Sequence, residues 1–239
     1  MKEEIIQLSK VLFEKINHVD DSIDDYIEDV KDLTDTASDL LKPIQTFKKL
    51  YGTVRMVKFR RFLKSYSSQL ENSFDSPDDL TAKMANYLNS EKNLNFVYDT
   101  IDSALNTKSV ICSSILGYLA GRILSKQLEP NMYDIIYINA LRSLNDFELK
   151  STIEIFDNTN DWSKNHTVSK NTYFSKNIES YEYTVQRLKG LLIIRETIEG
   201  TAGPISLGQS FWGTYKLNAI SEGFLQLIKD SGSYEKIHT

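Results

Sequence analysis

The sequence predicts a mainly α-helical protein, and three features of the chain lead to this prediction. Its 239 residues include only four prolines and ten glycines, which is few for a turn-rich all-β fold. Apolar residues recur at spacings of three and four over much of the chain, as they do on one face of an α-helix. Residues 110–124 are apolar nearly all round, as expected for the central helix of a bundle.

Residues 1–46 are predicted to form a long helix. It is acidic, since these residues include twelve acidic side chains and only five lysines. Pro43 is expected to kink or stop it. Apolar residues follow the heptad seam of a coiled coil over about four heptads: Ile16, Val19, Ile23, Tyr26, Val30, Leu33, Ala37, Leu40, Ile44 and Phe47. So narrow an apolar seam needs a partner helix. That partner is either the next segment, giving a helical hairpin, or a second copy of the chain, so self-association through 16–47 is one prediction.

The next segment is basic, and a helix is expected over residues 54–70. Residues 47–70 contain no acidic residue and seven basic ones: Lys48, Lys49, Arg55, Lys58, Arg60, Arg61 and Lys64. Such a block is typical of a surface for nucleic acid or for an anionic membrane. The alternative, which we favour, is that it packs beside the acidic helix and is neutralised within the chain.

Bundle helices are predicted over residues 77–128, completing an N-terminal helical domain over 1–128. Ser76 and Pro77 form a favourable helix start, with a serine cap followed by proline. Further helices are expected over 91–105 and 109–128. On the last of these, Gly117 and Gly121 are four residues apart and are expected to let a neighbouring helix approach closely. Cys112 is interpreted as a buried core residue.

The remaining residues, 129–239, are predicted to form a second domain. We expect a helix opened by Pro130, then a helix capped by Asn145 with Glu148 three residues on, as in a capping box. The order of the expected elements then runs as follows: a polar stretch without periodicity over 157–176, a helix over 180–189 ended by Gly190, strands over 192–198 and 211–217 joined by a glycine-containing loop, and a helix over 221–229.

Two stretches of this second domain, YTVQRLKGLLIIRE and FWGTYKLNAISEGFLQLI, resemble the third helix, wing and closing helix of bacterial winged helix-turn-helix domains. The resemblance covers about 60 residues closely and 110 loosely, and it implies a C-terminal winged-helix-like domain with a small β-hairpin. The connection of about 20 residues between the second and third helices departs from the family pattern. The whole chain also resembles phage- and abortive-infection-associated bacterial proteins, which implies a prophage or defence origin.

No catalytic, cofactor or metal site is predicted, and we therefore expect no enzyme. The three histidines lack neighbouring ligands at metal-binding spacing, and the glycines over 200–208 lack the lysine and helix of a phosphate-binding loop. The apolar run 110–124 is shorter than the ~20 residues that span a bilayer. One cysteine and a polar, acidic N-terminus favour a cytoplasmic protein without an integral membrane segment.

The expected function is therefore a non-enzymatic, regulatory or protein-interaction role, with DNA binding as the alternative. If the winged-helix resemblance holds, the third helix presents its contacts to DNA or to a partner: Tyr181, Gln186, Arg187 and Lys189. Residues 151–239 hold nine basic and ten acidic residues, whereas DNA-binding surfaces are basic. This balance places protein interaction ahead of DNA binding.

Overall fold

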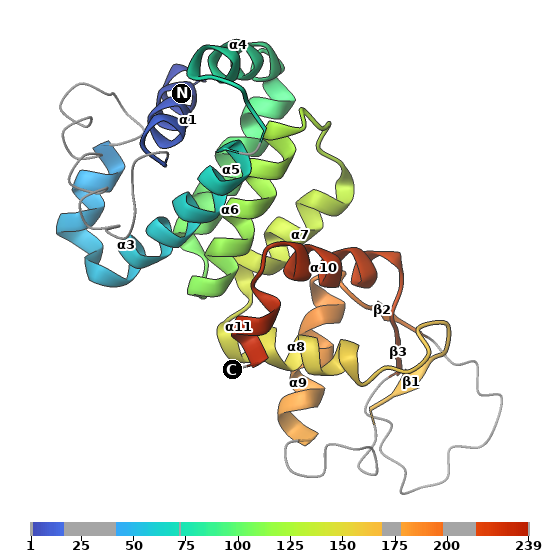
Figure 1. The fold of residues 1–239 in the computed structure, drawn as a ribbon. Coiled ribbons are helices and arrows are strands. Elements are labelled where there is room, and N and C mark those ends of the chain that lie inside the picture. The colour runs from blue at the N-terminus through green and yellow to red at the C-terminus, as the bar shows by residue number, and fades with distance from the viewer. Residues whose placement is uncertain (1, 17–41, 72, 169–177, 198–213, 239) are drawn as a thin grey trace, which may run out of the picture.

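The computed structural model describes residues 2–16, 42–71, 73–168, 178–197 and 214–238, and this part of the chain is mainly helical (Figure 1). The helices are α1 (Lys2–Ile16), α3 (Lys42–Glu71), α4 (Pro77–Tyr87), α5 (Glu91–Asn106), α6 (Val110–Ser125), α7 (Met132–Ser143), α8 (Asp146–Asp157), α9 (Ile178–Gly190), α10 (Ala219–Asp230) and α11 (Tyr234–His238). The strands are β1 (His166–Thr167), β2 (Arg195–Glu196) and β3 (Thr214–Lys216).

Helix α6 is the centre of the N-terminal bundle, as predicted. Eleven of its sixteen residues are buried, and α3 lies against it in the most extensive helix–helix contact among the described residues. Gly117 and Gly121 make this contact possible. A Cβ atom on Gly117 would lie 2.2 Å from the carbonyl oxygen of Phe62, and one on Gly121 would lie 2.7 Å from that of Tyr66. The expected close approach is confirmed, and α3 is the helix that approaches.

Prolines lie at the starts of α4 and α3, and only the start of α4 was predicted from the sequence. The Ser76 side chain accepts a hydrogen bond from the Asp79 backbone N–H, confirming the predicted start of α4. The helix predicted over 54–70 in fact begins at Lys42, so Pro43 lies in its first turn, where the missing N–H of proline costs nothing. Pro130 does not open α7, because Asn131 caps that helix.

The C-terminal strands form a three-stranded antiparallel sheet in the order β1-β3-β2. Strand β1 is a correction to the prediction, since no strand was expected in the polar stretch 157–176. His166 pairs with Tyr215 in this strand, and Trp162 packs against Phe156 with ring centroids 5.6 Å apart. Within the described residues, the strand predicted over 192–198 begins only at Arg195, as β2, and the strand predicted over 211–217 ends at Lys216, as β3.

Helix α9 ends differently from the prediction that Gly190 stops it. Gly190 is the last helical residue, and the left-handed conformation that ends the helix occurs at Leu192, with φ 62°. The Ile193 N–H then donates to the Leu188 carbonyl, as in a Schellman motif. Leu192 is 61% exposed, while Ile193 and Ile194 turn inward into the core.

Helix α7 contacts both of the regions predicted as separate domains, 1–128 and 129–239 (Figure 1). On one side it packs against α5 and α6, and the Thr107 hydroxyl donates to the Leu141 carbonyl at 2.7 Å. On the other side Tyr137 packs against Phe224 of α10 and donates its hydroxyl to the Ile220 carbonyl at 3.1 Å. The chain therefore uses α7 to join the N-terminal bundle to the C-terminal elements.

Several predicted features fall outside the described residues. They are most of the heptad seam over 16–47, the glycine-containing loop over 199–210, and Tyr173 in the polar stretch. Within the part that the structure describes, every helix is too short or too polar to span a lipid bilayer.

We predict that Gly117→Ala lowers the free energy of unfolding by about 1–3 kcal/mol, because the new methyl group overlaps backbone atoms of α3. Gly190→Ala is the matched control, since no heavy atom lies within 4 Å of the position that its Cβ would occupy. The control should leave stability unchanged or raise it by up to about 1 kcal/mol. Urea unfolding of both variants measures the difference, and equal stabilities would contradict the close-packing account.

Candidate functional site

The four residues predicted from the sequence to form a contact surface all lie on α9, but they face different surroundings. Tyr181 is buried, and its hydroxyl lies 2.8 Å from that of Tyr215 on β3. Burial raises the pKa of the Tyr181 hydroxyl. This side chain attaches α9 to the sheet and is turned away from solvent.

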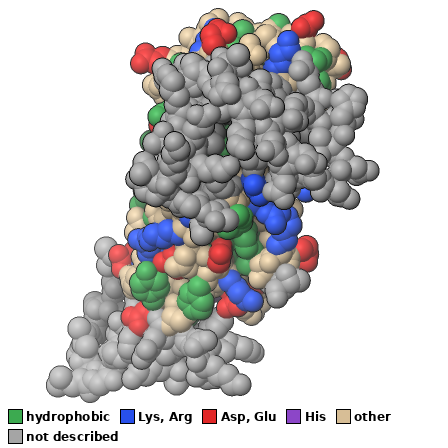
Figure 2. Space-filling model, turned by 90° about the vertical axis from the view of Figure 1, so that its left-hand side faces the viewer, with side chains coloured by type: hydrophobic (Ala, Val, Ile, Leu, Met, Phe, Trp, Pro, Cys, Tyr) green, Lys and Arg blue, Asp and Glu red, His purple; other side chains and the backbone are tan. Residues whose placement is uncertain are grey.

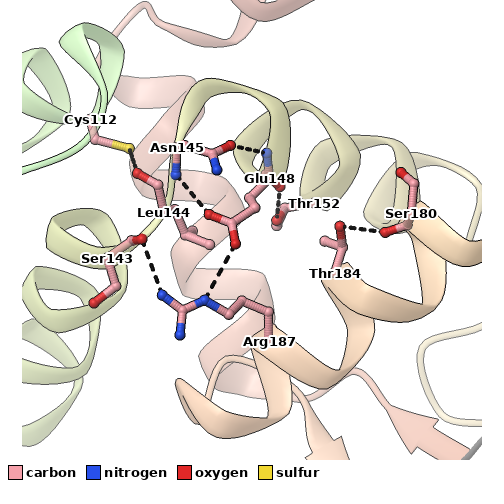
Figure 3. Close-up of polar contacts among 9 residues, drawn as sticks. All are labelled: Cys112, Ser143, Leu144, Asn145, Glu148, Thr152, Ser180, Thr184 and Arg187. Carbon is pink, nitrogen blue, oxygen red and sulfur yellow. Dashed lines mark hydrogen bonds and ion pairs between the residues drawn. The ribbon is translucent and has the colours of Figure 1, made fainter.

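Arg187 faces the junction between α7 and α8 (Figure 3). Its Nε donates to Oε1 of Glu148 at 3.3 Å, and its Nη2 donates to the carbonyl oxygen of Ser143 at 3.3 Å. The Glu148 side chain is only 2% exposed, whereas the Arg187 side chain is 34% exposed. Arg187 therefore neutralises a carboxylate that has almost no access to water.

The local sequence explains why this carboxylate is buried. Asn145 and Glu148 form the predicted capping box of α8: the Asn145 N–H donates to Glu148 Oε2 at 2.9 Å, and the Glu148 N–H donates to Asn145 Oδ1 at 2.8 Å. The acid is favoured at the positive N-terminal end of α8, and a cation is favoured beside the carbonyl end of α7, where Ser143 lies. Arg187 therefore links the two helix ends: it donates to the carbonyl end of α7 and to the carboxylate that caps α8.

The other two predicted residues differ in exposure. Lys189 has a side chain that is only 7% exposed, and its Nζ lies 3.4 Å from Oε1 of Glu196 on β2. Gln186 is exposed. Of the four predicted contact residues, Gln186 alone is exposed, and both cations of this group lie against carboxylates of their own chain.

Two aromatic side chains that were not selected from the sequence are exposed on the two helices that the ion pair of Arg187 with Glu148 joins. Phe147 on α8 is 54% exposed and Tyr183 on α9 is 55% exposed. Phe147 immediately precedes Glu148 in the first turn of α8. The Tyr183 hydroxyl forms a hydrogen bond with the Glu148 side chain, which raises the pKa of Tyr183. We call Phe147, Tyr183 and Gln186, with the half-buried Arg187 between the two helices, the α8–α9 surface.

A sequence signal for these aromatics existed. The buried face of α8 is formed by Leu149, Ile153 and Phe156, as predicted, and Phe147 falls outside this spacing. Tyr183 lies two residues after the buried Tyr181, so the two tyrosines point to different sides of α9. The position of a large aromatic residue on the polar side of an amphipathic helix was therefore readable from the sequence.

The predicted basic patch on α3 is only partly described. Lys58 is half-buried and donates from Nζ to the carbonyl oxygen of Thr107 at 2.5 Å, at the C-terminal end of α5. Arg60 is half-buried, while Arg61 and Lys64 are exposed. The side chains of Lys48, Lys49 and Arg55 lie outside the described part. Lys58 thus stabilises a helix end, as expected for a cation beside free carbonyl groups.

Figure 2 shows the side of the molecule that lies at the left in Figure 1. Among the described residues on this side, basic, acidic and hydrophobic side chains are interspersed. Among the described residues, no group of three or more histidine, cysteine, aspartate or glutamate side chains could hold a metal ion. Cys112 is buried, as predicted, and burial raises the pKa of its thiol to about 12.

The chain matches no protein-family model, no curated protein and no solved structure.

We predict that Glu148→Gln lowers the free energy of unfolding by about 1–3 kcal/mol, because Arg187 and Tyr183 lose their anionic partner inside the protein. Lys164→Gln is the control, since it removes an ion pair with Asp161 in which the lysine side chain is 74% exposed and the aspartate side chain is 38% exposed. The control should change stability by less than about 0.5 kcal/mol. Equal losses in chemical denaturation would show that the Glu148 pair has no special structural role.

Proposed function

We propose that this protein is a non-enzymatic interaction module, and that its C-terminal part binds a protein partner through the α8–α9 surface. The observation that carries the proposal is the combination of two exposed aromatic side chains on α8 and α9 with cations of α9 that pair with carboxylates of their own chain. Phe147 and Tyr183 are each more than half exposed, while Arg187 and Lys189 contact Glu148 and Glu196.

Exposed aromatic residues are the expected centre of a protein-binding surface. Tyrosine and other aromatics, together with arginine, are enriched among the residues that dominate binding energy at protein interfaces. The hydrogen bond from Tyr183 and the ion pair from Arg187 both end on the rigid capping box of α8. Both side chains are therefore held in place before a partner arrives, and this lowers the entropy lost on binding.

The order of the elements supports a winged-helix-like organisation for this part. Helices α7, α8 and α9 are followed by the antiparallel strands β2 and β3 and then by α10, which is the order that the resemblance implies. Winged helices that lack a basic face serve as docking modules, and we place this chain with them. A prophage or bacterial defence context remains part of the same proposal.

DNA binding is the second candidate function, and the exposure of Gln186 on α9 favours it. Gln186 could read a base edge, since glutamine forms paired hydrogen bonds with adenine. Phosphate contacts supply most of the non-specific affinity for DNA, and α9 offers few cations for such contacts. On α9 itself, Arg187 and Lys189 already face carboxylates, and we therefore rank protein docking first.

We predict that Phe147→Asp and Tyr183→Asp each abolish capture of a partner that the unmodified protein retains from a lysate of its native host. Both changes place a charge where an aromatic ring would be desolvated on binding. The measurement is quantitative mass spectrometry of the captured proteins, comparing each variant with the unmodified chain.

Tyr133→Asp on α7 is the matched control, because Tyr133 is 49% exposed and lies in the first turn of α7, at the opposite end of that helix from Ser143, which contacts Arg187. It should capture the same partner as the unmodified protein. A partner that is lost equally in all three variants, or retained in all three, would contradict docking at this surface. Circular dichroism confirms that each variant keeps its helical content.

A further inference from the structure

A second exposed apolar face lies on α7, separate from the α8–α9 surface. The helix buries one side against α5, α6 and α10 through residues such as Tyr137, Ile138 and Leu141. Its opposite side carries Met132, which is 67% exposed, and Ile135, which is 47% exposed. The exposed Asn139 continues this side, and Ile136 lies at its edge, half-buried and in contact with the core. These residues have the spacings of three, four and seven that place residues on one helix face.

Charged residues stand at the two ends of this face, and they have opposite signs. Glu129 precedes α7 and forms an ion pair with Lys92 of α5 at 3.0 Å. Arg142 lies in the last turn of α7 and forms an ion pair with Asp102 of α5 at 3.8 Å. Both pairs are largely exposed, so each contributes little within the chain and leaves its members accessible to a further partner.

We infer that α7 is the contact helix of a symmetric dimer, in which it pairs antiparallel with α7 of a second copy. A twofold axis between Ile135 and Ile136 places these two side chains against each other across the interface. The same axis places Met132 opposite Asn139 of the second copy and Glu129 opposite Arg142 of the second copy. One register thus brings apolar residues together at the centre and opposite charges together at both ends.

The two ion pairs between α5 and α7 explain why opposite charges meet at both ends of the α7–α7 interface. Because they join the starts and the ends of α5 and α7, these helices run side by side in the same direction. A twofold axis perpendicular to α7 keeps the α5 edges of both copies on the same side. Each end of the interface then carries alternating charges: Lys92 and Glu129 of one copy beside Arg142 and Asp102 of the other.

Helix α5 also enlarges the contact. Tyr98 is 40% exposed and lies in α5 between Lys92 and Asp102, the residues that form the two ion pairs with α7. Twelve residues of α7 extend only about 18 Å, and stable interfaces bury roughly 800 Å² on each partner. The contribution from α5 is therefore needed, and the dimer should have micromolar affinity. This inference is independent of the proposed docking function.

The test is sedimentation equilibrium of the full chain and of charge-reversal variants at micromolar concentrations. Glu129→Arg and Arg142→Glu should each weaken the dimer by about tenfold, since each reversal acts at both ends of a twofold interface. The double variant carrying both changes should regain the unmodified affinity, because the opposite charges again face each other between copies.

Within one chain the double variant places a cation beside Lys92 and a carboxylate beside Asp102, so both intrachain pairs become repulsive and rescue can arise only between copies. Ile135→Asp should give a monomer with unchanged helical content, since Ile135 is exposed. A monomeric unmodified protein, a dimer that survives Ile135→Asp, or a double variant weaker than both single variants would each overturn the inference.

Discussion

A carboxylate that is withdrawn from water must find hydrogen-bond donors within the protein, and Glu148 imposes this requirement on the C-terminal half of the chain. Its side chain is 2% exposed and receives donors from three directions: the backbone of Asn145, the guanidinium of Arg187 and the hydroxyl of Tyr183. The arrangement of α7, α8 and α9 follows from these contacts. Removing any one donor leaves a buried charge less well compensated, which is costly in a region of low dielectric constant.

The pairing of Glu148 with Arg187 also limits which charged groups of α9 are available to other molecules. The cation that a DNA-binding helix would direct at phosphate is held by Glu148, and the next one lies against Glu196. Two aromatic side chains, Phe147 and Tyr183, are among the groups left exposed on α8 and α9, beside polar residues such as Lys150 and Gln186. The physical chemistry of the surface therefore favours a protein partner, whose apolar side chains can bury Phe147 and Tyr183, over a polyanion.

Local signals in the sequence predicted much of the fold. The capping residues Ser76 and Asn145, the all-round apolar segment over 110–124 and the close approach at Gly117 depend on neighbouring residues or on helical periodicity, and they are confirmed. Strand β1 could not be predicted, because two residues joined to β3 across a long connection carry no periodic signal. Leu192 gave no sequence signal of its left-handed conformation, since glycine usually occupies that position.

The candidate site was harder to predict, because its character depends on contacts between residues far apart in the chain. Arg187 and Lys189 were selected as contact residues from their position on a helix, whereas their pairing with carboxylates of α8 and β2 depends on residues far away in the sequence. Phe147 and Tyr183 could have been selected from the sequence, since both depart from the buried spacing of their helices.

The most direct test of this account is a titration of fluorescently labelled genomic DNA fragments with the full chain at low salt, where phosphate contacts are strongest. The account predicts no measurable binding, because the cations of α9 are neutralised within the protein. Binding that weakens steeply with added salt and is lost in Gln186→Ala, a change at an exposed position of α9, would contradict it.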